Sequence, residues 1–218
     1  MLRDRAAPRP AGISRDAQTW IGASRLWTVS QKPDSMPFMI TPGQTLENPV
    51  TGERFTFTHT ASSTNGELLA FDFALRPGGA VPIPHVHPIQ TERFEVVEGR
   101  MRFRVGLRTL IAGPGDVVEV EPGVLHSFAN AGEEEARLRV EVRPALAMEE
   151  MFAEVVAMAR AGRMTRRGMP RNVFELAALA RRYAREAHAP FLSAAAQRLL
   201  LAPLAAFAQA PVARPLTP

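Results

Sequence analysis

The chain has no cysteine and only one lysine, Lys32, in its 218 residues. The lack of thiols excludes disulfide bonds, thiolate metal ligands and cysteine nucleophiles. Apolar residues still make up 46% of the chain, which is enough for one substantial core plus an appendage. Histidine is scarce as well, with five in the chain, so the spacing of the histidines is informative.

Long apolar runs are also missing. The most apolar stretch, residues 191–208, is interrupted by Gln197, Arg198 and Pro203, so we expect no transmembrane segment. The first residues are charged and no apolar core of suitable length follows them, so we expect no leader peptide and a cytoplasmic location.

The positive charge is concentrated in the flanks of the chain. Residues 35–158 carry ten basic and seventeen acidic side chains, whereas residues 159–188 carry eight basic and two acidic ones. This separation favours docking of basic flanks on the acidic middle, within or between chains, over nucleic-acid binding. We therefore expect no nucleic-acid partner, and a homodimer as the assembly.

The middle of the chain is predicted to be all β. Short apolar segments alternate with turns rich in proline and glycine, a spacing typical of a double-sheet jelly roll or small barrel. Among the turns, Asn65-Gly66 is the sharpest hairpin signal. The expected strands are residues 38–40, 54–59, 67–75, 93–97, 101–107, 117–120, 125–128 and 136–142.

Helices are predicted after Pro144. Apolar residues recur with a helical period from Met148 to Ala159. A second helix is expected to begin at the N-cap Asn172 and to be closed by His188, and a third to cover residues 191–208. We favour dimerisation or capping of the barrel mouth as their role over docking to a membrane surface or partner helix.

A candidate metal site is predicted from the three histidines near the middle of the chain. His85 and His87 would share one face of an extended segment, because side chains alternate along a strand. A short connection then makes Glu92 the start of an antiparallel return strand beside them, and His126 is expected near the start of a later strand. Three imidazoles and one carboxylate suit a divalent Fe, Mn, Ni, Co or Zn ion.

The stretches that carry these residues have regular spacing. Five residues separate Gly79 from His85, four separate His87 from Glu92, and six separate Glu92 from Gly99. The second stretch contributes Gly115, Gly123, His126 and Asn130. Both resemble the paired motifs of the cupin superfamily, except that Glu121 stands where the family usually has proline and the proline follows at Pro122.

The resemblance implies an all-β double-stranded β-helix, the cupin jelly-roll barrel, at residues 36–144. Residues 1–35, rich in Arg, Pro, Ser and Gly, are expected to be a flexible N-terminal arm. Residues 145–218 are expected to be a C-terminal α-helical extension.

The resemblance also implies a function and roles for the four ligands. We expect a metal-dependent dioxygenase-type oxidoreductase that acts on a small apolar or enolic molecule inside the barrel. His85, His87, Glu92 and His126 would hold one divalent metal ion, the one cofactor expected, and Glu92 would be the catalytic base. The alternatives are a non-catalytic small-molecule-binding or sensing module, and a sugar-type isomerase. His59 is expected outside the site, and Asn130 is expected to fix the last turn.

Overall fold

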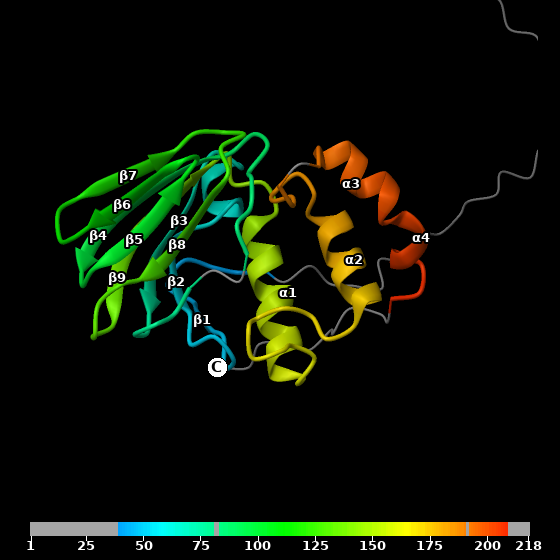
Figure 1. The fold of residues 1–218 in the computed structure, drawn as a ribbon, viewed down its shortest axis with the longest axis horizontal. Coiled ribbons are helices and arrows are strands. Elements are labelled where there is room, and N and C mark those ends of the chain that lie inside the picture. Colours follow the sequence, from blue (N-terminus) through cyan, green and yellow to red (C-terminus); the bar gives the residue numbers. More distant parts are fainter. Residues whose placement is uncertain (1–38, 81–82, 191, 209–218) are drawn as a thin grey trace, which may run out of the picture. The chain divides into compact units, whose positions relative to one another are not determined.

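The computed structural model describes residues 39–80, 83–190 and 192–208, and the predicted arm at residues 1–35 lies outside them. The strands form two antiparallel sheets, ordered β1-β2-β3-β9-β4-β7 and β6-β5-β8 (Figure 1). The predicted β-barrel architecture with a helical extension is confirmed. The strands are β1 Thr45–Glu47, β2 Arg54–His59, β3 Leu69–Leu75, β4 Thr91–Glu98, β5 Met101–Val105, β6 Arg108–Ala112, β7 Val117–Val120, β8 His126–Asn130 and β9 Ala136–Arg143.

Alternation along the strands builds the core. In β9, Leu138, Val140 and Val142 are buried, while the alternating arginines are exposed and Glu141 is half-buried, as the period of two predicts. The register then aligns buried side chains across the large sheet: Phe55 is opposite Phe73, which is opposite Leu138. Each such row adds an apolar layer beneath the sheet.

Three strand predictions need correction. Residues 39–40 are not a strand, and β1 lies further on. Gly106, at φ 57°, turns the chain and ends β5, so the predicted strand at 101–107 is shorter and β6 follows. β6 was not predicted because all but its last residue are exposed, which leaves no alternation to detect.

The predicted Asn65-Gly66 turn is part of a longer connection. Both residues have positive φ, 52° and 83°, as a tight turn requires. The connection between β2 and β3 nevertheless spans residues 60–68 and includes a 3-10 turn at Ser62–Thr64. The strands pair as predicted, through a longer loop than expected.

In the described part of the chain, four helices follow the barrel: α1 Met148–Arg160, α2 Val173–Arg182, α3 Ala194–Leu200 and α4 Ala202–Ala205. Asn172 caps α2 as predicted, accepting the Phe174 N–H at 2.8 Å. Helix α2 ends at Arg182, so the prediction that His188 closes it is wrong; His188 pairs with Val86 through their backbones instead. The third predicted helix is divided into α3 and α4.

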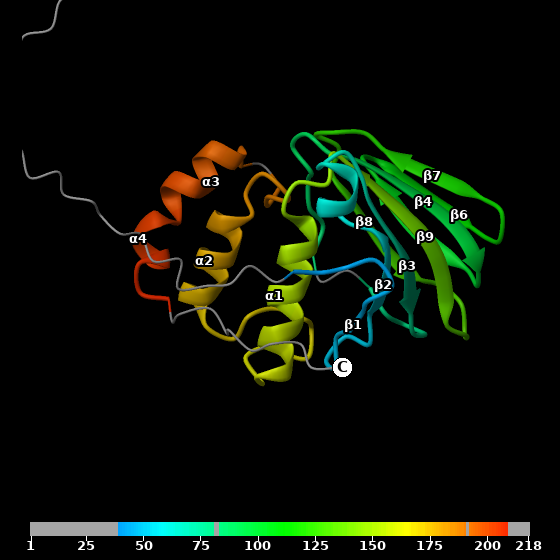
Figure 2. The same cartoon turned by 180° about the vertical axis from the view of Figure 1, so that it is seen from behind.

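Helix α1 is the element that joins the barrel to the other helices, between the sheets and α2 in both views (Figures 1 and 2). On the barrel side, the Phe152 ring stacks on Phe55 with centroids 4.6 Å apart. On the other side, Glu154 accepts hydrogen bonds from Tyr183 at 2.9 Å and Arg182 at 2.6 Å. Within the described ranges, no helix has the length and apolar character to cross a membrane.

We expect Gly99→Ala to destabilise the fold by about 1–3 kcal/mol more than Gly66→Ala. Both glycines have φ 83°, so alanine brings the same backbone strain at each. Only at Gly99 would the new Cβ also lie 2.8 Å from the Ala136 Cα, whereas the space at Gly66 is open. Urea unfolding of the two variants measures the difference, and equal free energies of unfolding would contradict the predicted backbone clash.

Candidate metal centre

The structure brings His85, His87, Glu92 and His126 together, with one ligand atom from each within 4.8 Å of all the others. The His85 and His87 Nε2 atoms are 3.1 Å apart. Glu92 Oε2 lies 2.9 Å from the His126 Nε2 and 3.3 Å from the His87 Nε2. His87, Glu92 and His126 are 3%, 6% and 2% exposed, so the group is enclosed.

The histidine segment pairs differently from the sequence prediction. His85 and His126 exchange two backbone hydrogen bonds of 3.0 Å, so this segment lies beside β8 in the small sheet. Glu92 is opposite Val120 and Val142 in the large sheet. The predicted hairpin between the histidines and Glu92 is therefore wrong, because the four ligands meet across two sheets.

Backbone carbonyls fix the orientation of all three imidazoles. The His85 Nδ1–H donates to the Ile83 carbonyl at 3.2 Å and the His126 Nδ1–H to the Val124 carbonyl at 3.0 Å. The His87 Nδ1–H donates to the Glu186 carbonyl. A carbonyl oxygen only accepts, so each Nδ1 carries a hydrogen and each Nε2 lone pair faces the centre.

This arrangement fits a cation. Facing nitrogen and carboxylate lone pairs at 2.9–3.3 Å repel each other unless positive charge lies between them, from protons or from a metal ion. Metal bonds of about 2.0–2.2 Å place neighbouring ligand atoms about 3.0–3.5 Å apart, close to the observed separations. One divalent ion would satisfy all four side chains at once.

The pKa values reflect the same need for positive charge. Burial, with the nearby His126 and His87, lowers the pKa of His85 to about 4. Burial also acts to lower the pKa of His87, but the Glu92 carboxylate and the Glu186 carbonyl outweigh it and the pKa is raised. Burial acts to raise the pKa of Glu92, yet His87 and His126 hold it well below its usual range. The Glu92 side chain is thus ionised and His85 is neutral, the states that metal binding requires.

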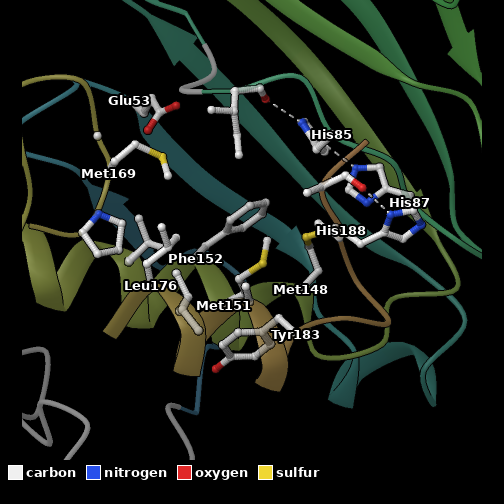
Figure 3. Close-up of a pocket in the computed structure, with 18 of the residues that line it drawn as sticks. Glu53, His85, His87, Met148, Met151, Phe152, Met169, Leu176, Tyr183 and His188 are labelled. Atoms are coloured by element: carbon white, nitrogen blue, oxygen red, sulfur yellow. Dashed lines mark hydrogen bonds between the residues drawn. The ribbon is translucent and has the colours of Figure 1, made fainter. Parts of the chain in front are cut away.

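The ligand cluster opens into a cavity of about 470 Å³ between the barrel and the helices (Figure 3). Phe55, Phe71, Phe94 and Phe128 form its barrel wall, and Met151, Phe152 and Leu176 are among the residues of its helical wall. No arginine or lysine of the described ranges lines it. The walls are therefore suited to an apolar organic molecule.

The other predicted positions have separate roles. His59 is exposed and is not among the residues that line the cavity. His188, which was expected to close a helix, is half-buried and lines the cavity. Asn130 does fix the last turn, since its side chain donates to Glu134 O at 2.7 Å and accepts from Gly132 N at 2.8 Å.

The C-terminal extension contacts the metal centre directly, which the sequence did not predict. Besides the Glu186 carbonyl on His87, the backbones of Val86 and His188 exchange hydrogen bonds of 3.1 and 3.0 Å. The Glu186 carboxylate accepts the Ala147 N–H at 3.1 Å and so anchors this segment at the start of α1. No local pattern signals these contacts, because about a hundred residues separate the partners.

Comparison with known proteins agrees with this geometry. The family model described as "Cupin domain" matches residues 71–143, which include all four ligands. Two Arabidopsis thaliana proteins, "Germin-like protein subfamily T member 3" and "Germin-like protein subfamily 1 member 4", are 34% and 35% identical over 73 and 78 residues, 31% and 32% of this chain. The matched part spans about a third of each relative, 32% and 34%.

A solved structure gives a weaker likeness. An RmlC-like cupin from Shewanella frigidimarina is 22% identical, with a TM-score of 0.43, over 53% of this chain and 96% of its own. At this TM-score the likeness adds nothing to the family match. The helices after residue 143 lie outside that match.

We expect Glu186→Ala to weaken metal binding by about tenfold, in the range for loss of a group that supports a ligand. Without its carboxylate the Ala147 N–H loses its partner, and the carbonyl that orients His87 is less firmly held. Isothermal titration with Zn²⁺ and thermal melting measure affinity and stability separately. Glu186→Gln keeps an acceptor and should restore affinity, and Arg185→Ala, on the exposed side, is the matched control. Unchanged affinity in Glu186→Ala would refute the positioning role.

Proposed function

Because the chain belongs to the cupin superfamily, we propose that it is a metal-dependent oxidoreductase of the dioxygenase type, with one divalent transition-metal ion held by His85, His87, Glu92 and His126. The observation that carries the proposal is the convergence of three Nε2 atoms and one carboxylate oxygen at an apolar cavity. Relatives that share only a third of their length with this chain do not extend their activity to it.

The proposed substrate is a small apolar molecule with an enol or phenol hydroxyl. A divalent ion bound by these residues would act as a Lewis acid toward the substrate oxygen and, if redox-active, would support dioxygen chemistry. The phenylalanine walls would exclude water and hold the substrate against the centre. Largely apolar walls favour such a molecule over a charged one.

Glu92 is proposed to accept the substrate proton. Its Oε2 faces His126 and His87, while its Oε1 has no hydrogen-bond partner among the described residues. That oxygen belongs to a side chain on the cavity wall, within reach of a hydroxyl bound there. A proton from the substrate would therefore pass to Glu92 Oε1.

A second candidate is a binding or sensing module without turnover. The observation that favours it is the direct contact between the histidine segment and residues 186–188, which would let the helices respond to occupancy of the centre. A sugar-phosphate isomerase is less well supported, because a phosphate needs cationic partners and no arginine or lysine of the described ranges lines the cavity.

We expect the protein, purified without added metal, to contain about one equivalent of a divalent transition metal by elemental analysis. His126→Ala should weaken affinity by about a hundredfold or more, because it removes a ligand and leaves Glu92 without its 2.9 Å partner. His59→Ala removes an exposed histidine and should leave the metal content unchanged. Metal retained in both variants would place the ion elsewhere.

We expect Glu92→Gln to lower oxygen uptake with enolic and phenolic compounds by about a hundredfold or more, because the amide can neither take the proton nor supply a charged ligand to the metal ion. An oxygen electrode measures uptake by protein loaded with iron or manganese. Glu95→Gln, on the same strand but among surface arginines, is the control and should retain activity. Tight binding of such compounds without oxygen uptake by the wild type would favour the sensing module.

A further inference from the structure

A second buried carboxyl lies on the wall of the same cavity. Glu53, next to the start of β2, is 8% exposed and lines the cavity at the end away from the histidines (Figure 3). Phe152 and other apolar side chains lie between the two ends in this view. The cavity therefore has a polar group at each end and apolar walls between them.

Only half of the Glu53 carboxylate is used by the protein. Its Oε2 accepts hydrogen bonds from Thr51 Oγ1 at 2.7 Å and Asn48 Nδ2 at 3.4 Å, which stabilise the turn before β2. Its Oε1 has no hydrogen-bond partner among the described residues. Burial raises the pKa of Glu53, as expected for a carboxyl that lacks full compensation. The turn therefore uses one carboxylate oxygen, and the other is available to a molecule in the cavity.

The strand register gives the span between the two ends. Phe55 in β2 is aligned through β3 and β9 with Val96 in β4, four residues beyond Glu92. Glu53 lies two residues further in the same direction. Six residues at about 3.3 Å each separate the two carboxyl positions by roughly 20 Å along the strands. A small compact molecule would not contact both.

We propose that the substrate is an elongated apolar molecule with an oxygen ligand for the metal at one end and a hydroxyl at the other, which donates a hydrogen bond to Glu53. The proposal rests on the metal centre proposed above and adds the shape and the distal group of the ligand. A cavity of about 470 Å³ has room for about fifteen water-sized groups, the size of such a chain.

The helical extension forms the second wall of the cavity, so the proposed preference for an elongated ligand depends on residues outside the family match. The wall facing the barrel comes from α1, from residues 164–170 and from α2, all outside the part that matches the cupin model. Without these helices the apolar surface between the two ends would be open on one side. The extension thus encloses the length of the ligand, and Glu53 recognises its distal end.

The test compares pairs of ligands that differ only by the distal hydroxyl. Isothermal titration of the metal-loaded protein with dodecanoate and 12-hydroxydodecanoate should show about a tenfold preference for the hydroxylated compound, as expected for a hydrogen bond to a charged group. Octanoate and 8-hydroxyoctanoate are too short to reach both ends and should bind equally. Equal binding of the two longer compounds would overturn the proposal.

Variants separate recognition from folding. Glu53→Leu should abolish the preference, and Glu53→Gln, which keeps a neutral acceptor and the turn, should reduce it to about threefold. Glu47→Gln, at an exposed position of β1 outside the cavity lining, should leave the preference unchanged. A full preference in Glu53→Gln would overturn the proposal even if Glu53→Leu does not fold.

The metal centre is tested independently in the same experiment. The two ligands of a pair have the same carboxylate group, so its contribution to binding is the same for both and does not affect the ratio of their affinities. His126→Ala should weaken both compounds and leave the ratio intact. If only the metal proposal fails, the ligand affinities will not depend on metal, but the hydroxylated compound will still bind more tightly. If only the Glu53 proposal fails, the two compounds of a pair will bind equally, and their affinities will still depend on metal.

Discussion

Three hydrogen bonds from imidazole Nδ1 atoms to backbone carbonyls determine what this protein can bind. They turn three Nε2 lone pairs toward the Glu92 carboxylate in an enclosed space, which is stable only with positive charge at the centre. Two of the carbonyls are local, each two residues before its histidine. The carbonyl two residues before His87, that of His85, accepts the His126 N–H instead, and the acceptor for His87 is the Glu186 carbonyl of the C-terminal extension.

The barrel and the extension divide the functional requirements between them. The barrel supplies the four candidate ligands and the aromatic wall of the cavity. The helices supply the opposite wall and one of the carbonyls that orient the ligands. Under the proposed function, chemistry at the centre would depend on the barrel, whereas the choice of molecule would depend on the helices together with Glu53.

The sequence predicted the features that depend on local spacing. The period of two placed His85 and His87 on one face, and turn signals identified most strands. The same period does not say which strand is the partner, so the segment was paired with Glu92 instead of β8. The contacts of His87 with Glu186 and of Val86 with His188 arise from tertiary packing, and Glu53 resembles any polar residue before a strand. None of these has a signature in a single sequence.

The hydrogen bonds at Val86 and His87 couple two events. Docking of residues 186–188 on the histidine segment would be thermodynamically linked to binding of an ion at the centre. Any ion that prefers correctly oriented imidazoles lowers the population of states in which this segment is detached, by an amount set by ion concentration and affinity. Linkage is reciprocal, so whatever loosens the last third of the chain also loosens the ion by the same factor. Whether the ion is retained in a cell would then depend on whether the C-terminal helices are folded, although these helices donate no ligand to it.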